Sequence, residues 1–268
     1  MKQLKNKTVL ITGGGSGIGK IMTRLCLERG AKVIIWDINQ KNIDNTLSAF
    51  SSQGEVYGFQ VDVSNYENIQ DVAKRVKNEV GRVDVLINNA GIVVGKFFNE
   101  HTVSDITNTM AINANGPMYV TLAFLDDMMA HNTGHICNIA SSGGLISNPK
   151  MSVYAASKWA LIGWSDSLRL EMIQKNKAIN VTTILPYYIN TGMFDGVQSK
   201  IPILDPEAAS LTIIKAIESN KRLVSIPGYI YRFTRLGQAL LSINAFDWFA
   251  GKALGIYKTM EHFTGRKK

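Results

Sequence analysis

The sequence has little cysteine, little proline and no long hydrophobic run. Its two cysteines, Cys26 and Cys137, lie outside any CxxC pattern, which favours buried free thiols in a reducing compartment over a disulfide or a metal site. Six prolines in 268 residues are too few for a linker-rich chain. No uninterrupted apolar stretch reaches the length of about 18 residues that spans a bilayer, and no signal-peptide cleavage site follows the basic N-terminus. We therefore expect a cytoplasmic, single-domain protein without a metal.

Acidic residues are scarce at the C-terminal end, and this scarcity accounts for most of the net charge of +8. From residue 221 onward there are nine Lys and Arg but two acidic residues, whereas the preceding chain has 20 basic and 19 acidic side chains. The nearly neutral body argues against a nucleic-acid groove. The tail, residues 227–268, interleaves basic with aromatic and aliphatic residues over two expected helical segments. It predicts a basic amphipathic extension packed on the same domain.

Short runs rich in Val and Ile alternate with longer segments of helical period, which is typical of βαβ units and a parallel sheet. Strands buried on both faces read as continuous hydrophobic runs, as KVIIWD and NVTTILP do. We expect an α/β, single-domain Rossmann fold over residues 1–226, with a doubly wound seven-stranded parallel sheet and helices on both faces. The expected strands are 8–12, 31–37, 55–61, 83–88, 134–140, 178–185 and 222–226. The expected helices are 17–29, 39–51, 65–80, 103–130 (broken near its start), 152–175 and 205–219.

A glycine-rich turn, TGGGSGIG at 12–19, links the first strand to the first helix. Glycines there let backbone amides approach a pyrophosphate at the positive end of the helix. The cluster alone is a weak signal, but the flanking strand and helix, together with Asp37 at the end of the second strand, complete a dinucleotide fingerprint. Asp37 would bind the adenosine ribose and repel a 2′-phosphate, which favours NAD and leaves NADP as the alternative. Asp37 could instead be a strand-end polar residue or a helix N-cap.

Polar residues that could carry chemistry follow later strands. Tyr154 and Lys158 are four residues apart on an expected helix, so their side chains project from the same face. Ser141 directly follows the fifth strand, where the carboxyl ends of parallel strands open onto a ligand crevice. Asp62, at the end of the third strand, could accept from an adenine amino group or simply form a turn. A surface Tyr/Lys pair and a turn serine remain the alternatives for the others.

These segments together make the sequence resemble the classical short-chain dehydrogenase/reductase family over about residues 5–226. The matching segments, in the family's order and spacing, are TGGGSGIG, NNAG at 88–91, Asn113, the serine of IASS at 141 and YAASK at 154–158. Ser141 rather than Ser142 fits, because the family places this serine 13 residues before the tyrosine. The resemblance implies hydride transfer between a nicotinamide and an alcohol or carbonyl carbon, and a homodimer or homotetramer formed through the helices at 103–130 and 152–175.

The resemblance also implies residue roles. Tyr154 would exchange the hydroxyl proton, and Ser141 would hydrogen-bond the substrate oxygen. The Lys158 ammonium would lower the pKa of the Tyr154 phenol by favouring the phenolate, and would hold the nicotinamide ribose. Asn113 would hold a water in the proton relay, and Asn88 would steady the central sheet. The implied cofactor-binding residues are Gly13, Ser16, Gly17, Ile18, Gly19, Asp37, Asp62, Val63, Asn89, Ala90, Gly91, Tyr154, Lys158, Pro186, Ile189 and Thr191.

The sequence departs from the family after the sixth strand. The usual Pro-Gly is replaced by Pro186-Tyr187, which puts in doubt how closely the backbone approaches the nicotinamide ring, while Thr191 keeps the position of the carboxamide contact. The apolar residues of 187–204 could line a pocket or only pack the loop down. Together with IIWDIN at 34–39 and the tail, this segment resembles the branch of retinol dehydrogenases and lipid-associated hydroxysteroid dehydrogenases. A lipophilic alcohol, ketone or aldehyde substrate is therefore expected.

Two other interpretations remain open. The protein could bind a dinucleotide as a sensor or interaction module without turnover, although the Ser141, Tyr154 and Lys158 set argues against it. The tail could contact a membrane surface, cover the substrate pocket or form a dimer contact. We expect its Phe, Trp and Leu side chains to be buried beside the substrate entrance. Its basic side chains would face outward, available to an anionic lipid surface; they include Arg232, Arg235, Lys252 and Lys258.

Overall fold

A single parallel sheet forms the centre of the molecule. The computed structural model describes residues 3–265, so Arg266, Lys267 and Lys268 of the basic tail lie outside the described residues. Within 3–265, seven strands pair in parallel in the order β3-β2-β1-β4-β5-β6-β7. The strands are β1 (Thr8–Thr12), β2 (Lys32–Asp37), β3 (Val56–Gln60), β4 (Val85–Asn88), β5 (Gly134–Ile139), β6 (Ile179–Pro186) and β7 (Leu223–Ile226). This confirms the doubly wound Rossmann fold.

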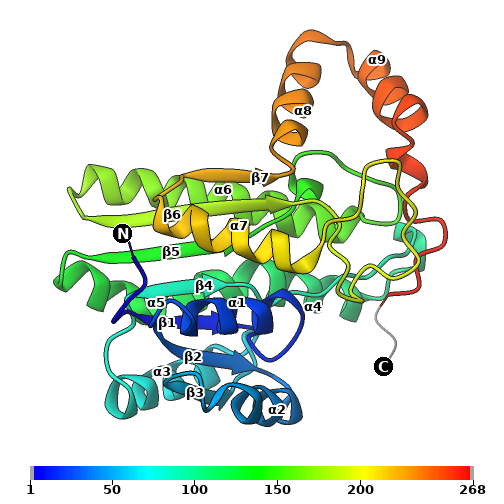
Figure 1. Ribbon diagram of the computed structural model, residues 1–268. Coiled ribbons are helices and arrows are strands. Elements are labelled where there is room, and N and C mark those ends of the chain that lie inside the picture. Colours follow the sequence, from blue (N-terminus) through cyan, green and yellow to red (C-terminus); the bar gives the residue numbers. More distant parts are fainter. Residues whose placement is uncertain (1–2, 266–268) are drawn as a thin grey trace.

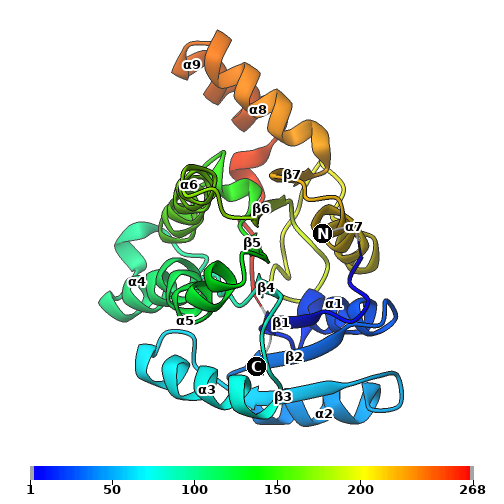
Figure 2. The ribbon, with the colours of Figure 1, turned by 90° about the vertical axis from the view of Figure 1, so that its left-hand side faces the viewer.

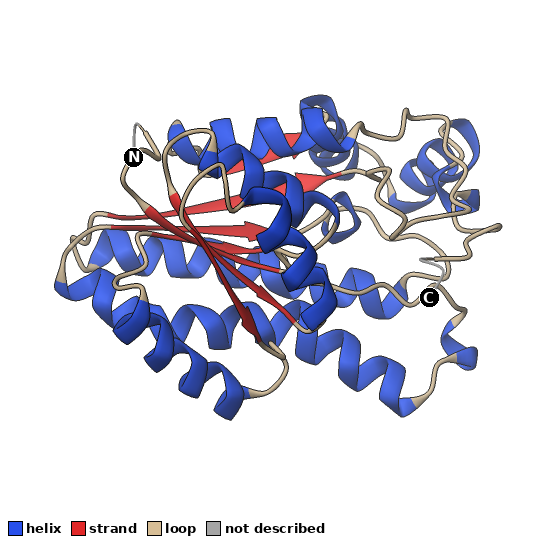
Figure 3. Ribbon diagram, turned by 60° about the horizontal axis from the view of Figure 1, so that its bottom comes forward, coloured by secondary structure: helices blue, strands red, loops and turns tan. Residues whose placement is uncertain are grey.

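Helices cover both faces of the sheet (Figures 1, 2 and 3). One layer contains α1 (Gly17–Leu27), α2 (Gln40–Phe50) and α7 (Pro206–Glu218). The other contains α3 (Tyr66–Glu79), α4 (Val103–Met110), α5 (Gly116–Ala130) and α6 (Ser152–Gln174). Because the strand order reverses between β1 and β4, the two halves of the sheet diverge there, and a crevice opens at the carboxyl ends of these strands.

Successive side chains of a strand enter two separate cores. Val9 and Ile11 of β1 pack into the core beneath α1 and α7, whereas Leu10 packs into the opposite core beneath α3 and α5. All three are fully buried, as expected for a strand with helices on both faces. The two cysteines are free and buried in the first core, in agreement with the sequence prediction.

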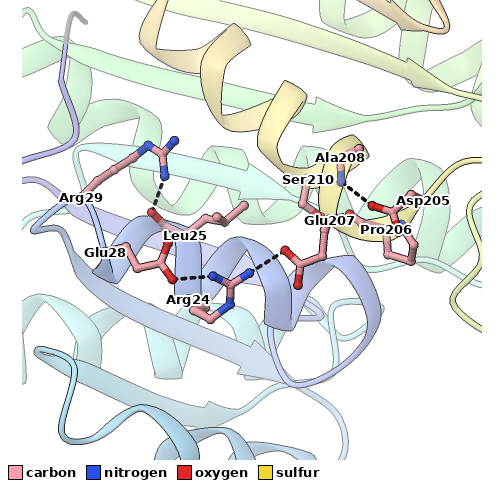
Figure 4. A network of polar contacts seen from close by, with 9 residues as sticks. All are labelled: Arg24, Leu25, Glu28, Arg29, Asp205, Pro206, Glu207, Ala208 and Ser210. Carbon is pink, nitrogen blue, oxygen red and sulfur yellow. Dashed lines mark hydrogen bonds and ion pairs between the residues drawn. The ribbon is translucent and has the colours of Figure 1, made fainter.

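Polar contacts at the surface of the first layer hold α7 against α1. Arg24 of α1 contacts Glu28 and also donates to Glu207 of α7 at 2.5 Å (Figure 4). Asp205 caps α7 by accepting from the amide of Ala208 at 2.8 Å. These contacts fix the layer that begins at the glycine-rich turn.

The expected break in the helix at 103–130 is a π-helical turn. α4 ends at Met110, Ala111–Asn115 forms the wide turn, and α5 begins at Gly116. A side chain at Gly116 would lie 3.0 Å from the carbonyl oxygen of Val63, so a glycine permits this close approach. π-turns inside helices are frequent at functional sites, and this one contains Asn113.

The tail forms a hairpin of α8 (Gly228–Leu240) and α9 (Ile243–Asp247) that stands away from the sheet beyond β7 (Figures 1 and 2). The expectation that its large apolar side chains are buried is wrong here: Phe233 of α8 is 67% exposed, and Trp248, directly after α9, is 60% exposed. The reason is that α8 buries mainly Ile230 and Thr234 against the body.

The chain after the hairpin returns to the body, where Met260 and Phe263 pack near Tyr154. The basic residues Arg232, Arg235, Lys252 and Lys258 are exposed, as expected. Among the described residues, no helix combines the length and the apolar character needed to cross a membrane.

Candidate active site

The residues singled out from the sequence converge at the carboxyl ends of the central strands. Two adjoining pockets occupy the crevice there and share Gly13, Ser16, Ala90, Gly91 and Ile92. The inner pocket contains Ser141, Tyr154 and Lys158, and the outer pocket contains Asp37 and Asp62. The remaining candidates that line one pocket or the other are Gly17, Ile18, Val63, Asn89, Pro186, Ile189 and Thr191. Of the predicted site residues, only Gly19 and Asn113 lie behind the walls of this crevice.

The glycine-rich turn forms a tight cradle between the pockets. Gly13 and Gly17 have φ of +64° and +53°, a region that favours glycine. A Cβ on Gly19 would lie 2.0 Å from the carbonyl oxygen of Gly13, so no other residue fits there without moving the turn. α1 begins at Gly17, and its first amides therefore point toward the cradle. This geometry fits a pyrophosphate group.

Asp37 joins the end of β2 to the glycine-rich turn. Its carboxylate accepts from the amides of Gly15 and Asn39, both at 3.0 Å, and it is buried beside the outer pocket. The alternative of a helix N-cap is wrong, because Asn39 caps α2 by accepting from the amide of Asn42 at 3.2 Å. Asp37 therefore faces the outer pocket with its orientation fixed by two backbone donors.

Asp62 forms a turn, as one of its two interpretations predicted. Its carboxylate accepts from the amide and the hydroxyl of Ser64, at 2.9 and 2.6 Å. Asp62 and Val63 also line the outer pocket. The turn therefore places the carboxylate at the edge of the crevice, and the two interpretations are compatible.

Thr12 is a residue of the site that the sequence reasoning did not single out. Its hydroxyl accepts from the amides of Asn89 and Ala90, both at 3.0 Å. In return, the Asn89 carboxamide donates to the carbonyls of Thr12 and Gly13, at 3.0 and 3.3 Å. This reciprocal clamp fixes the NNAG segment against the glycine-rich turn. The only signal in the sequence was the position of Thr12 at the head of that turn.

Asn88 has the structural role expected of it. From the buried end of β4 its carboxamide donates to Asn138 at 2.8 Å and to the Thr121 hydroxyl at 3.1 Å. Asn138 in turn donates to Ser165 of α6 at 2.8 Å. This network ties β4, β5, α5 and α6 together beneath the inner pocket.

The inner pocket brings Ser141, Tyr154 and Lys158 together. Tyr154 and Lys158 come from the first two turns of α6, and Ser141 follows β5. All three are at most 9% exposed. The Lys158 ammonium donates to the carbonyl of Ile139 at 2.9 Å and lies 5.8 Å from the centroid of the Tyr154 ring. The Ser141 hydroxyl accepts from the amide of Gly143 at 3.0 Å, which orients it at the start of a short turn.

Burial controls the protonation of these groups. It raises the pKa of Tyr154 to about 12, against the opposing effect of a hydrogen bond with Ser141. It also lowers the pKa of Lys158 to about 8. The expectation that Lys158 brings the pKa of Tyr154 below its ordinary value is therefore wrong for the protein alone, because desolvation penalises both the phenolate and the ammonium. At neutral pH the Tyr154 phenol is therefore protonated, and Lys158 is still largely charged.

Asn113 lies behind the inner pocket, where it positions the backbone. Its carboxamide accepts from the amide of Ile92 and donates to the carbonyl of the same residue, both at 2.8 Å. The amide group also donates to Ser157 at 3.2 Å. A side chain at Gly91 would lie 3.2 Å from the Asn113 oxygen, so the segment after β4 packs closely here. Both amide hydrogens of Asn113 are used within the protein, and its part in a water relay stays a prediction.

Tyr187, in the place of the family's glycine, is built into the wall of the inner pocket. Its amide donates to the carbonyl of Ile226 at 2.8 Å, and its hydroxyl lies 2.8 Å from that of Ser199. The side chain therefore ties the start of the loop at 187–204 to Ser199 later in the same loop. Burial raises the pKa of Tyr187 to about 12, so it remains neutral in this role.

The loop at 187–204 both lines the pocket and packs against the body. Met193 and Phe194 line the inner pocket, and neither was assigned a definite role from the sequence. The Phe194 ring meets Tyr154 edge-on, with 6.0 Å between centroids. Ile201 and Leu204 instead pack into the cluster beneath the loop. The pocket is therefore apolar on the side that faces Tyr154.

Comparisons with known proteins found a family model, named relatives and a solved structure that are similar to this chain. The family model described as short chain dehydrogenase matches residues 7–202. Epidermal retinol dehydrogenase 2 of Mus musculus is 36% identical over 274 aligned residues, covering all of this chain and 88% of the relative. Estradiol 17-beta-dehydrogenase 11 of Pongo abelii is 33% identical over an alignment that covers 89% of this chain and 81% of the relative. A short-chain dehydrogenase/reductase from Burkholderia phymatum, solved in complex with NAD, shares the fold with a TM-score of 0.82. Its sequence is 24% identical, and the match covers 89% of this chain and 95% of that structure's chain.

Proposed function

This chain belongs to the short-chain dehydrogenase/reductase family, and from that premise we propose that it transfers a hydride between a nicotinamide dinucleotide and an alcohol or carbonyl carbon. One observation carries the proposal: a single crevice has the glycine cradle at its centre, Asp37 at one end and Tyr154 with Ser141 at the other. The alternative, a dinucleotide-binding sensor without turnover, is not favoured because it gives no reason for Tyr154, Ser141 and Lys158 to be grouped in one buried pocket.

The residues around the crevice fit a dinucleotide. Gly13 and the first amides of α1 would hold the pyrophosphate, and Asp62 with Val63 would border the adenine. Asp37 would bind the adenosine ribose, and its negative charge favours NAD over NADP. Lys158 and Thr191 would hold the nicotinamide ribose and carboxamide. When bound, the dinucleotide supplies the hydride donor or acceptor.

Tyr154 moves the proton in this proposal. With a pKa of about 12 it holds its proton at neutral pH and can donate it to the oxygen of a carbonyl substrate that is hydrogen-bonded to Ser141. In the oxidation direction the phenolate must form, and the nearby Lys158 ammonium is the cation that can stabilise it. Burial of all three side chains excludes water, which strengthens these interactions.

A lipophilic substrate fits the pocket best. Tyr187, Met193 and Phe194 present aromatic and apolar surface beside Tyr154, and apolar side chains are what a retinoid, steroid or long-chain alcohol would contact. The relatives named as retinol and estradiol dehydrogenases support the same class. Because such a substrate partitions into lipid, we also propose peripheral contact of the tail with a lipid surface.

We further propose a homodimer or homotetramer formed through α5 and α6. Leu122 of α5, with Leu170 and Ile173 of α6, are each more than half exposed in the single chain. Exposed apolar side chains on two helices of one layer are suited to an isologous contact.

Two measurements test the proposed function. A panel of retinoids, steroids and long-chain alcohols, assayed with NAD and with NADP by the nicotinamide absorbance, should show turnover of the bulky apolar members with NAD. Tyr154→Phe should lower kcat by about 10²–10⁴-fold while the dinucleotide Kd changes little, because the phenol acts on the proton. Turnover of small polar sugars alone would remove the lipophilic substrate, and a Tyr154→Phe enzyme with most of its kcat would remove the catalytic assignment.

A further inference from the structure

The hairpin of α8 and α9 exposes large apolar side chains that the fold does not use. On α8, the residues Tyr229, Phe233, Leu236 and Leu240 are spaced by four, three and four positions, which places them on one stripe of the helix. They are 46% to 79% exposed. We call this set, extended by the exposed Ile243 of α9 and by Trp248 and Phe249 directly after it, the hairpin face. Monomeric proteins rarely leave such a group uncovered.

The hairpin is attached to the body through the buried Ile230 of α8 and through hydrogen bonds. The carboxamide of Gln238 donates to the carbonyl of Leu145 at 2.9 Å, and the Tyr257 hydroxyl donates to Asp247 at 2.5 Å. Within the hairpin, Gly237 allows the ring of Phe246 to approach α8, because a Cβ there would lie 2.8 Å from that ring. Other contacts therefore hold the hairpin, and the hairpin face stays available for a partner.

The charge of the hairpin is positive. Arg232 and Arg235 are exposed on α8 beside the apolar stripe, and Lys252 is exposed just after α9. The sequence has no acidic residue from 223 to 246, and the first one, Asp247, already accepts a hydrogen bond from Tyr257. An apolar stripe flanked by long basic side chains suits the interface of an anionic lipid layer, where the stripe inserts and the cations meet the headgroups.

Three neighbouring cavities, each sharing a lining residue with the next, lie between the hairpin and the inner pocket. The groove beneath the hairpin, about 310 Å³, is bordered by Ile243 and Ile146. Ile146 also borders a small cavity of about 20 Å³, which shares Ser141 and Phe194 with the inner pocket. The small cavity is a constriction that must widen for a bulky molecule. If the small cavity widens, an apolar compound in a lipid layer at the hairpin would reach Ser141 past mostly apolar side chains.

We propose that the hairpin face docks into an anionic lipid surface, so that the groove beneath it opens toward the lipid. A second copy of the chain is a poorer occupant, because a symmetric contact through this face would bring the arginines of both copies together. The use of the groove by substrate rests on the proposed function, whereas docking itself is measured without substrate or dinucleotide.

Sedimentation with vesicles tests the docking. The full chain should pellet with phosphatidylcholine vesicles that contain phosphatidylserine, and less as salt is raised. Phe233→Asp combined with Leu236→Asp should reduce the bound fraction at least about tenfold, because a charge replaces each inserted side chain. Arg232→Gln combined with Arg235→Gln should weaken binding to the anionic vesicles specifically. Val103→Asp, which changes an 80% exposed apolar residue at the start of α4, is the matched control and should bind like the wild type.

Three results would overturn the proposal: no pelleting of the wild-type chain, pelleting that the Phe233/Leu236 variant leaves intact, or an equal loss in the Val103 control. Light scattering without lipid tests the alternative that the hairpin face binds a second copy of the chain. A Phe233/Leu236 variant with a lower molar mass than the wild type would assign the face to that subunit contact. Turnover on soluble substrate should be unchanged in the Phe233/Leu236 variant. Failure of docking with normal turnover would therefore reject this inference and leave the proposed function standing.

Discussion

Replacing Lys158 by methionine should make the protein more stable while it removes activity. Burial lowers the pKa of Lys158 from the ordinary 10.5 to about 8, and this difference corresponds to about 3 kcal/mol of unfolding free energy lost at pH 7. Methionine has a similar length and no charge, but it gives up the hydrogen bond to Ile139, which with a charged donor is worth about 1.5 kcal/mol. We therefore expect a net gain of about 1.5 kcal/mol in the protein purified without dinucleotide.

The gain should depend on pH in a defined direction. The folded state holds the Lys158 proton less tightly than the unfolded state, so the cost of burial is fully present below a pH of about 8 and shrinks as the pH rises toward 10.5. At a pH of about 9.5 the wild type should have recovered about 2 kcal/mol, and the two proteins should then be nearly equal in stability.

Equilibrium unfolding in urea at the two pH values measures this difference. Lys177→Met is the matched control, because Lys177 also donates to a single carbonyl, that of Met129 at 3.1 Å, but from a partly exposed position. The control should gain nothing at either pH. A Lys158→Met protein that is less stable than the wild type at pH 7, or a gain that does not change with pH, would show that burial of the Lys158 charge does not cost stability.

Three further outcomes follow from the geometry of the crevice. Gly19→Ala should abolish dinucleotide binding, measured by fluorescence titration, because its Cβ would lie 2.0 Å from the carbonyl oxygen of Gly13. Asp37→Ala should narrow the preference for NAD over NADP, measured as the ratio of kcat/KM values, because the ribose contacts and the repulsion of a 2′-phosphate are lost together. Asn88→Ala should lower the free energy of unfolding by about 1–3 kcal/mol, and Tm by several degrees, because Asn138 loses its buried donor.

Controls separate these effects from general damage. Gly163→Ala adds a Cβ into open space on α6, so it should leave dinucleotide binding unchanged. Equal binding by the Gly19 and Gly163 variants would contradict the cradle. A wild-type preference for NADP would remove Asp37 from the ribose, and an Asn88 variant as stable as the wild type would show that the network beneath the inner pocket is not needed for stability.

The fold could be predicted from the sequence because its determinants are local and repeated. Seven short apolar runs that alternate with helical segments leave few arrangements other than a parallel sheet with helices on each side, and the central strands are buried on both faces. The helix break at 103–130 was also expected, but its form was not. A π-turn at Asn113 depends on how Gly116 packs against Val63, which the sequence does not encode locally.

Properties that depend on burial depth or on side-chain contacts across the chain were harder to predict. The spacing in the sequence predicts that Tyr154 and Lys158 lie on one face of a helix, but it does not predict how deeply they are buried. Burial sets the direction of both pKa shifts. Thr12 acts through two backbone amides 77 and 78 positions away, a contact that leaves no spacing signal. The exposed hairpin contradicted the assumption that an amphipathic helix faces its own core, because Phe233 points to solvent.

Tyr154 belongs to the same apolar cluster as the loop and the end of the tail. The cluster joins it to Tyr187 and Val197 of the loop, to Ile230 of α8 and to Met260 near the C-terminus. Exchange of the loop alone with that of a relative would therefore change the packing around Tyr154 as well as the shape of the pocket. Under the proposed function, such an exchange should alter substrate preference and reaction rate together. A successful graft would have to carry the loop, the base of α8 and the returning C-terminal segment as one unit.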